Sequence, residues 1–585
     1  MLRIFRNFRA KDLGFLICGI LLVAIQVGLE LKMPDYMSEI TRLVQTEGSE
    51  MGDILGNGGW MMLCALGSFA ATVGAGFCFA TASARLSMNT RKKLFDKVES
   101  LGMHEVKKFS TSSLITRSTN DITQIQMFVA MGAQMLVRAP MTAAWAIIKI
   151  SGKSWQWSTA TGIAVVFLLS VMFSVMALVI PRFKKVQKLT DRINGITREN
   201  LTGIRVVRAF NAEKYQEKKF NNTNTELTKT QLFNERMLSI LSPTMYFVMN
   251  FLTVVIYVIG AYIISDAAAM DKLTIFSDMV VFSTYAMHVI MSFLFVAITL
   301  MILPRAQVSA NRINEVLKTK ESIKDGTFDD ETAERGTVEF RNVSFKYPDA
   351  EDYLLRDISF RAEAGETVAF IGSTGSGKST LINLVPRFYD ATDGEVFVDG
   401  VNVRDYKQKA LHNRIGYVPQ KAVMFNGTVS SNVAYGDNGR GKKSEKAIEE
   451  AIKIAQAKSF VEKMDKDYSA HIAQGGTNVS GGQKQRLAIA RAIARDPEIY
   501  IFDDSFSALD YKTDAALRRD LKKHTGNATN LIVAQRIGTI MHADKIIVLD
   551  EGRCVGMGTH KELMKNCEVY QQIALSQLTK EELDV

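Results

Sequence analysis

A glycine-rich run near residue 372 contains the residue types that bind phosphate groups. Residues 372–379 read Gly-Ser-Thr-Gly-Ser-Gly-Lys-Ser, which fits the pattern G-x-x-x-x-G-K-S. The apolar residues before it predict a short strand and those after it predict a helix, which is the context this pattern requires. Glycines let the backbone curl until its amides converge on phosphate oxygens, and the lysine adds a point charge. The expected phosphate-binding residues are Gly372, Ser373, Thr374, Gly375, Ser376, Gly377, Lys378, Ser379 and Thr380.

A second run supplies a carboxylate for the same site. Residues 498–503 form the pattern of a buried strand that ends in Asp503. In P-loop proteins a carboxylate in this position and the hydroxyl of the phosphate loop both hold Mg²⁺. We therefore expect Ser379 and Asp503 to be ligands of a Mg²⁺ ion that accompanies the bound nucleotide.

A Ser-Gly-Gly turn lies between these two runs and opens a helical segment. The amides at the start of a helix, together with its dipole, attract anions. The turn alone is weak evidence, but its position after the phosphate loop and shortly before Asp503 strengthens it. The residues of this turn are Ser480, Gly481, Gly482 and Gln483.

The elements that position these residues belong to the second of two expected domains, since 585 residues exceed one hydrophobic core. Before about residue 305 the chain is dominated by long apolar stretches. A bilayer requires about 20 apolar residues per helix, so we expect six membrane spans. These spans are residues 13–31, 60–82, 128–150, 159–181, 245–264 and 279–303.

Charge indicates the orientation of the spans. Residues 182–236 carry 13 Lys and Arg against 6 Asp and Glu, and the first charged residues of the chain are all basic. Residues 32–57 instead carry a surplus of acidic side chains and are expected to form an acidic loop. The positive-inside rule therefore predicts that both termini and the segment 182–236 are cytoplasmic. The basic residues behind the formal charge of +10 follow this pattern. They show no basic, aromatic-lined groove, which argues against nucleic acid as a partner.

Ionisable residues inside spans are candidates for function, with snorkelling or hydration near helix ends as the alternative. They are Glu30, Arg138, Lys149, Asp278 and His288. The five cysteines show neither zinc spacing nor a disulfide framework, so we interpret them as small apolar residues or free thiols.

Taken together, these motifs resemble those of ABC transporters of the exporter type, in which six spans precede one nucleotide-binding domain. The resemblance covers nearly the whole chain. It implies a helical transmembrane domain over residues 1–315, a linker at 316–335 and an α/β P-loop ATPase domain at 336–585. By the same resemblance the nucleotide is ATP and Tyr347 stacks on adenine. Gln420 is implied to join Ser379 and Asp503 at the Mg²⁺ and to lie near the membrane domain. Residues 480–483 resemble the signature loop, preceded by Val479 where leucine is usual. Ser507, Ala508, Leu509 and Asp510 resemble the D-loop.

In this family two cassettes close head to tail, so that each ATP lies between the P-loop of one chain and the signature loop of the other. The resemblance therefore implies an obligate dimer with a second half-transporter. This chain departs from the family at both catalytic positions. Asp504 stands where the family has a catalytic glutamate, and Gln535 stands where it has a switch histidine. A third departure is Ala-Gln-Gly-Gly at residues 473–476, where Glu-Arg-Gly is usual.

These departures are typical of the degenerate ATP site in bacterial heterodimeric exporters, which the sequence closely resembles; two unrelated substitutions are the alternative. The resemblance implies ATP hydrolysis mainly at the partner's site and export of a small hydrophobic or amphipathic, drug-like compound by alternating access. Segments 109–116 and 211–215 are expected to form the cytoplasmic tips that convey closure of the cassettes. The expected location is the bacterial plasma membrane. Lipid or peptide export, a homodimeric exporter and an ATP-gated channel are the alternatives.

Overall fold

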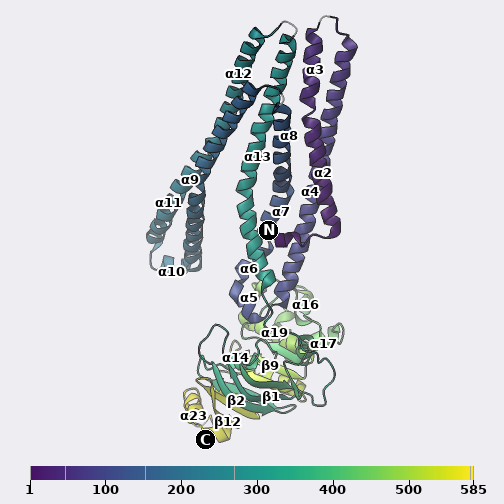
Figure 1. Cartoon of the computed structure of the whole chain (residues 1–585). Coiled ribbons are helices and arrows are strands. Elements are labelled where there is room, and N and C mark those ends of the chain that lie inside the picture. The colour runs from purple at the N-terminus through teal and green to yellow at the C-terminus, as the bar shows by residue number, and fades with distance from the viewer. Residues whose placement is uncertain (1, 47, 152, 269–270, 580–581, 584–585) are drawn as a thin grey trace. The chain divides into compact units, whose positions relative to one another are not determined.

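The computed structural model describes residues 2–46, 48–151, 153–268, 271–579 and 582–583. The chain divides into two compact units, Met1–Glu99 with Ser112–Lys318, and Ser100–Thr111 with Thr319–Val585. The first is built from long helices and the second from strands and shorter helices (Figure 1). The division after Lys318 lies close to the predicted end of the transmembrane domain. Residues 100–111, which the sequence assigned to that domain, belong to the second unit instead.

Every regular element that the structure describes in the first unit is a helix. Its α-helices are α1 (Leu2–Phe5), α2 (Ala10–Glu30), α3 (Met33–Gln45), α4 (Met51–Ser100), α6 (Thr111–Ser118), α7 (Asn120–Met127), α8 (Ala133–Ser151), α9 (Trp155–Thr202), α10 (Ile204–Ala209), α11 (Glu213–Ser239), α12 (Leu241–Asp266) and α13 (Lys272–Lys318). A π-helical turn at Phe128–Gly132 joins α7 to α8. As predicted, α4, α9 and α13 continue far beyond the apolar stretches that they contain.

Among the described residues, five helical segments are long and apolar enough to cross a membrane. They are Ala10–Gln45, Met51–Ser100, Trp155–Thr202, Glu213–Asp266 and Lys272–Val296, and each overlaps one predicted span. The predicted span 128–150 is not among them. It consists of the π-helical turn and α8, which is only 19 residues long and carries Arg138 and Lys149. This helix nevertheless packs against α2 and α13.

The charged side chains of these helices pair across the unit instead of remaining isolated. Arg138 of α8 donates to Glu30 of α2 at 2.9 Å, and Lys149 of α8 pairs with Asp35 of α3 at 2.5 Å. Lys153 pairs with Asp278 of α13. These pairs explain how α8 can lie among apolar helices despite its charges, because a paired charge costs far less to bury than a single one.

The acidic segment 32–57 is not the loop that the sequence predicted. Most of it is helical, since only two residues separate the end of α2 from the start of α3, and α4 already begins at Met51. Pro34 lies in the first turn of α3, where its missing amide hydrogen costs no helical hydrogen bond. Asp35 and Glu39 therefore lie on α3 and Asp53 lies on α4, while Glu50 lies just before α4.

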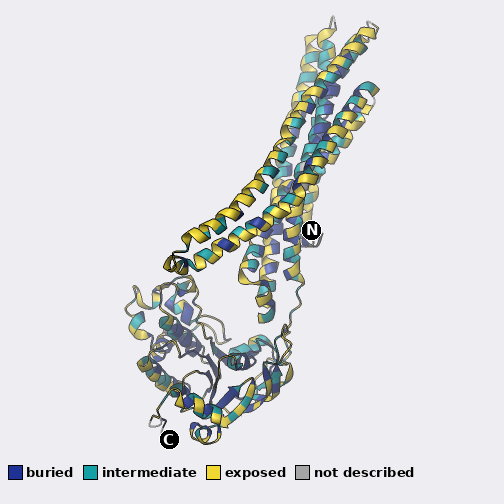
Figure 2. Cartoon of the chain, turned by 90° about the vertical axis from the view of Figure 1, so that its left-hand side faces the viewer, coloured by how far each residue is buried: buried dark blue, intermediate teal, exposed yellow. Residues whose placement is uncertain are grey.

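Burial differs strongly between the two units (Figure 2). The long helices expose large apolar side chains along much of their length, among them Phe69, Phe77, Ile163 and Phe173. An apolar surface of this extent requires an apolar medium or another chain to cover it. In the second unit the strands Ile499–Asp503 and Thr529–Val533 are buried along their whole length, as expected of a domain with its own core.

The second unit contains two main sheets. Six strands have the order β12-β11-β3-β10-β9-β6, in which all neighbours except β11 and β12 are parallel. Their bounds are β3 (Thr367–Gly372), β6 (Ile415–Val418), β9 (Ile499–Asp503), β10 (Thr529–Val533), β11 (Lys545–Asp550) and β12 (Arg553–Gly558). An antiparallel sheet has the order β2-β1-β4-β5, with β1 (Val338–Phe345), β2 (Leu355–Ala362), β4 (Asp393–Val398) and β5 (Val401–Asn402). Parallel strands end at one edge of their sheet, and that edge carries the site.

Short helices surround these sheets. They are α5 (Met103–Phe109), α14 (Lys378–Ile382), α15 (Gln408–Arg414), α16 (Val429–Val433), α17 (Glu445–Ile454), α18 (Lys458–Val461), α19 (Gly481–Arg495), α20 (Tyr511–His524), α21 (Ile537–Ile540), α22 (His560–Asn566) and α23 (Glu568–Leu575). A two-stranded ribbon pairs β7 (Gly427–Thr428) with β8 (His471–Ile472). One apolar core lies between the two main sheets, and a second joins the parallel sheet to α17, α19 and α20.

Candidate nucleotide-binding site

The glycine-rich loop joins β3 to α14, as the sequence predicted. Gly372 has φ +154°, and a Cβ atom there would lie 1.9 Å from the carbonyl oxygen of Leu549. Gly377 has φ +94°, and its Cβ would lie 2.5 Å from Cδ2 of Leu355. Both positions therefore exclude any side chain, for reasons of backbone conformation and of space. Within the loop between them, the amide of Ser376 donates to the carbonyl oxygen of Ser373 at 3.2 Å.

Lys378 folds back over this loop. Its ammonium group donates to the carbonyl oxygens of Gly372 and Ser373 at 2.9 and 2.7 Å. Burial lowers the pKa of Lys378, while the carboxylates of Asp503 and Asp504 act in the opposite direction. A partly buried cation held above a loop of backbone amides is complementary to a polyphosphate.

The two predicted Mg²⁺ ligands lie in contact. The Ser379 hydroxyl donates to Oδ1 of Asp503 at 2.6 Å, although the two residues are 124 positions apart. Burial raises the pKa of Asp503, against the effect of this hydrogen bond. One hydroxyl and one carboxylate, supplemented by waters and phosphate oxygens, form the donor set that Mg²⁺ prefers. The described residues contain no group of three or more His, Cys, Asp and Glu side chains able to hold a metal.

Three strands of the parallel sheet bring the remaining predicted residues to the same edge. Gln420 follows β6, Asp504 follows β9 and Gln535 follows β10, in neighbouring positions of the sheet. The topology thus places these three side chains together, though 84 positions separate Gln420 from Asp504 and 31 separate Asp504 from Gln535.

Both glutamines bind one carboxylate oxygen. Nε2 of Gln535 donates to Oδ2 of Asp504 at 2.8 Å, and Nε2 of Gln420 lies 3.3 Å from the same oxygen. Asp504 is buried and has φ +47°, a left-handed conformation that aspartate tolerates better than most residues. Its carboxylate is therefore fixed from two sides by neutral amide donors.

Tyr347 belongs to an aromatic cluster beside the phosphate loop. Its ring packs edge-on against Phe345 and Tyr389, and its hydroxyl lies 3.0 Å from that of Thr380. Lys107 of α5 approaches both tyrosine rings, with its ammonium nitrogen 5.7 Å from each centroid. Hydrogen bonding to Tyr389 raises the pKa of Lys107. The partly exposed face of Tyr347 suits the stacking of a planar base.

The Ser-Gly-Gly turn opens α19, as expected. Ser480 is its N-cap and forms a capping box with Gln483. A Cβ atom on Gly481 would meet open space, so the start of this helix is accessible to a ligand or a second chain. In the preceding 473–476 segment, Gln474–Gly476 form an irregular 3₁₀ turn in which Gly475 has φ +69°, and the amide of Gly475 donates to the carbonyl oxygen of Met424.

The predicted D-loop, residues 507–510, lies shortly after β9, which ends at Asp503 and is followed by Asp504. The Ser507 hydroxyl donates to the carbonyl oxygen of Asp504 at 2.9 Å, and Arg536 donates to the carbonyl oxygen of Ser507. Asp510 caps α20 by accepting from the amide of Thr513. Ala508 is exposed, and its carbonyl oxygen lies against Gly482, so this loop touches the signature turn of its own chain.

Comparison with known families agrees with this arrangement. The family described as ABC transporter transmembrane region matches residues 16–301, and the family described as ABC transporter matches residues 355–507. The chain belongs to the ABC transporter family. It is a half-transporter in which one helical transmembrane domain is fused to one ABC ATPase domain that couples ATP hydrolysis to transport.

Several known proteins are similar to this ABC transporter. An uncharacterized ABC transporter ATP-binding protein from Mycobacterium tuberculosis is 36% identical over 93% of each chain. The ATP-dependent lipid A-core flippase of Pseudomonas aeruginosa is 32% identical over 85% of this chain and 80% of the flippase. A solved structure described as a bacterial Atm1-family ABC exporter with ATP bound shares the fold, with a TM-score of 0.78 over 96% of this chain and 24% identity.

Two residues of this ABC transporter site were not predicted. Tyr389 and Lys107 complete the aromatic cluster, but neither belongs to a motif. Tyr389 shortly follows the phosphate-loop helix, which is a weak signal. Lys107 lies far away in the sequence within a basic segment, and only the structure reveals its contact with the tyrosine rings.

Proposed function

We propose that this ABC transporter is one half of a heterodimer that exports a hydrophobic or amphipathic compound, and that its own ATP site hydrolyses ATP slowly. The observation that carries the proposal is the fixed Asp504 carboxylate. A general base must lie within about 3 Å of the proton that it removes. Asp504 is one methylene shorter than glutamate, and one of its oxygens already accepts from Gln535 at 2.8 Å.

In this proposal Lys378 binds the phosphates, Ser379 and Asp503 hold the Mg²⁺ that neutralises phosphate charge, and Tyr347 stacks on adenine. The signature turn, residues 480–483, completes the ATP site of the partner, whose own glutamate and histidine supply the catalysis. Accessibility of Gly481 supports this role, since the turn must meet a ligand held by another chain. Lys378, Asp503 and Asp504 then bind ATP at the slow site, where Gln535 offers no imidazole for catalysis.

Transport follows from closure of the two cassettes around ATP. ATP drives closure only because it binds the closed state more tightly than the open one. The turns near residues 109–116 and 211–215 are proposed to convey closure to the spans, and the inward-facing cavity becomes outward-facing. Hydrolysis at the partner's site reverses the change.

The proposed location is the plasma membrane of a bacterium, with both termini in the cytoplasm. The surplus of basic residues in 182–236 supports this orientation. The similar proteins from bacteria support the cellular context. A drug-like compound is the proposed substrate, and the apolar surfaces of the helices are compatible with it.

Lipid export is the second candidate. Its support is the identity of 32% shared with the lipid A-core flippase of Pseudomonas aeruginosa. The ion pairs at Arg138 and Lys149 give the unit polar positions that the head group of a lipid requires.

The test compares ATP hydrolysis by this chain alone and by this chain co-purified with its partner half-transporter. We expect low activity from the lone chain and high activity from the pair. Replacing the partner's catalytic glutamate with glutamine abolishes the activity of the pair, whereas Asp504→Asn changes it little. Rapid hydrolysis by the lone chain that is lost in Asp504→Asn contradicts the degenerate site and indicates a homodimer.

A further inference from the structure

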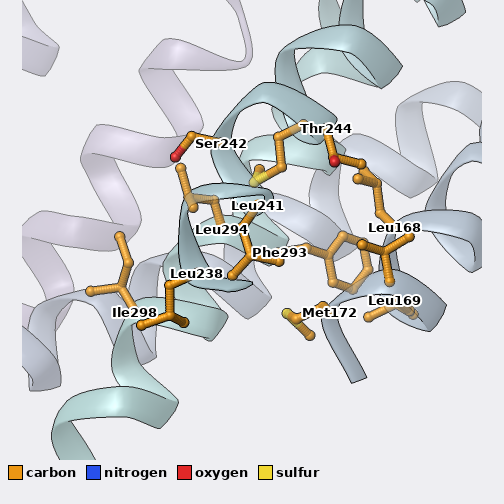
Figure 3. A pocket seen from close by; sticks show the side chains of 12 residues that line it. Leu168, Leu169, Met172, Leu238, Leu241, Ser242, Thr244, Phe293, Leu294 and Ile298 are labelled. Atoms are coloured by element: carbon orange, nitrogen blue, oxygen red, sulfur yellow. The ribbon is translucent and has the colours of Figure 1, made fainter. Parts of the chain in front are cut away.

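The helical unit contains an apolar pocket between α9, α12 and α13 (Figure 3). Its volume is about 320 Å³, and Ser242 and Thr244 are the polar residues of its lining. Polar groups give a pocket its specificity, and two hydroxyls identify no particular occupant. The ATPase unit offers more specific contacts, because its C-terminal segment binds the backbone beside the ATP site.

Gln577 lies just after α23 and holds the segment that carries Gln535. We call this segment, residues 535–537, the switch segment. Nε2 of Gln577 donates to the carbonyl oxygen of Gln535 at 2.8 Å. Its Oε1 accepts from the amide of Ile537 at 2.9 Å. One side-chain amide therefore binds the backbone on both sides of Arg536, although 42 and 40 positions separate Gln577 from its two partners.

The start of α21 explains why this contact is needed. Ile537 is the first residue of α21, and amides at the start of a helix have no partner within the helix. A side chain at the N-cap position often supplies one, but the N-cap here is Arg536, whose side chain forms no capping hydrogen bond. Ile537 is fully buried. Gln577 thus supplies, from a remote part of the chain, the acceptor that this helix start lacks.

The surroundings of Gln577 are anchored on both sides. Tyr570 and Ala574 of α23 are fully buried, and the amide of Gln577 donates to the carbonyl oxygen of Ala574 at 3.1 Å. Further along the chain, Leu583 is 1% exposed, and its carbonyl oxygen lies 3.4 Å from Nε2 of His560. Gln577 is therefore a fixed point against which the switch segment is held.

The switch segment carries this hold to the ATP site. Nε2 of Gln535 donates to Oδ2 of Asp504 at 2.8 Å, and Arg536 donates to the carbonyl oxygen of Ser507 in the D-loop. A fixed backbone keeps the Gln535 amide on the carboxylate. If the backbone were loose, Oδ2 of Asp504 would keep only the longer contact of 3.3 Å to Gln420 among these donors.

We propose that Gln577 is a positioning residue that restrains this ATP site. By fixing the switch segment it keeps the Gln535 amide on Asp504, and this amide occupies a carboxylate oxygen that a general base needs free to accept a proton. The inference deepens the proposed function, on which it rests, by assigning control of the slow site to the C-terminal segment. Removing the restraint should speed hydrolysis, whereas damage to a merely structural residue slows it.

The first measurement is amide hydrogen exchange of the full chain in detergent, without nucleotide. In Gln577→Met the side chain keeps its length but loses both hydrogen bonds. Exchange of the Ile537 amide should therefore accelerate about fivefold, as expected for the loss of one hydrogen bond. Gln571→Met is the matched control, because Nε2 of Gln571 donates to the carbonyl oxygen of Met564 at 2.8 Å and not to the switch segment. It should leave exchange at Ile537 unchanged.

The second measurement is single-turnover ATP hydrolysis by the full chain purified alone, with the chain in excess over ATP. Gln577→Met should raise the rate constant about fivefold, while the affinity for ATP stays within about twofold. Gln577→Glu retains an acceptor for Ile537 but offers no donor to Gln535, so it should raise the rate while exchange at Ile537 stays slow. In a Gln535→Met background neither variant should add a further increase, because the restrained amide is already gone. Gln571→Met should leave the rate unchanged.

Three results overturn the inference in variants that elute as the wild type does in size-exclusion chromatography. The first is exchange at Ile537 that Gln577→Met leaves unchanged. The second is a rate that falls in Gln577→Met or stays within about twofold of the wild type. The third is an increase that persists in the Gln535→Met background or appears equally in Gln571→Met. Rapid hydrolysis by the wild-type lone chain that is lost in Asp504→Asn instead refutes the slow site, and the restraint with it. The two failures are distinguishable, because one appears in the variants of Gln577 and the other already in the wild type.

Discussion

If the ATP site of this chain is degenerate as proposed, lengthening the side chain at position 504 should raise its rate of ATP hydrolysis. In Asp504→Glu the carboxylate moves outward by one carbon–carbon bond, about 1.5 Å. A displacement of 1 Å in a reacting group costs about 10²-fold in rate. We therefore expect Asp504→Glu to raise kcat of the lone chain by about 10²-fold, which corresponds to about 2.7 kcal/mol at 1.36 kcal/mol per tenfold change.

The neighbouring amide limits this gain. Gln535 donates to Asp504 at 2.8 Å and would still hold part of the longer carboxylate. Replacing it in the double variant Asp504→Glu/Gln535→His removes that donor and supplies an imidazole. Since a positioned acid or base contributes about 10²–10⁴-fold, the double variant should exceed the single one. The left-handed backbone at residue 504 suits glutamate less well, which lowers stability and not kcat.

The assay is steady-state ATP hydrolysis by the purified lone chain, with ATP binding measured in parallel so that changes in kcat and affinity are separated. Lys378→Ala gives the background. Adding Asp503→Asn to Asp504→Glu should remove the gain, because the proposed Mg²⁺ ligand is lost. The reasoning fails if both variants bind ATP normally and remain within about twofold of the wild type, well below the expected effect.

Three further predictions concern other parts of the chain. Arg138→Leu leaves the charge of Glu30 without its partner and should destabilise the protein by about 3–5 kcal/mol. Adding Glu30→Gln should restore part of this stability, and thermal unfolding in detergent measures both effects. Equal stability of the single and the double variant contradicts the pairing. Burial beside Glu498 raises the pKa of Asp399 from 3.8 to about 6, so the folded state binds this proton more tightly than the unfolded one. Stability should therefore fall as pH rises from 3.8 to about 6 and change little above it, and Asp399→Asn should flatten this slope in thermal unfolding across that range. Lys107→Met removes a cation from two tyrosine rings at a cost of about 0.5–1 kcal/mol each, and should reduce transport more than ATP hydrolysis when both are measured in proteoliposomes.

The phosphate loop was predictable because its chemistry is local. The glycine positions, Lys378 and Ser379 all act within one turn, and steric limits at Gly372 leave no other residue type possible. Asp503 was predictable for a similar reason, since a fully buried strand that ends in a carboxylate is a distinct pattern. The predicted spans likewise rest on apolar length, which the bilayer imposes on any sequence.

What depends on tertiary contacts was not predictable. The segment 32–57 was interpreted as a loop from its charge, but charge does not prevent a helix whose surface is exposed. Periodicity cannot show that Arg138 meets Glu30, because the two residues lie 108 positions apart.

The placement of residues 100–111 has a consequence for how such a protein can be divided. The polypeptide passes between the two units at three points, near residues 99, 111 and 318, so a cut at the linker alone does not separate them. A gene split at that point would leave α5, with its buried Glu105 and Phe109, on the membrane-bound product. The membrane-bound product would then keep residues 100–111, a segment that belongs to the ATPase unit and could bind to the separated ATPase. The ATPase expressed by itself would lack one of its own pieces, and fusing residues 100–111 to its first residue should improve its solubility.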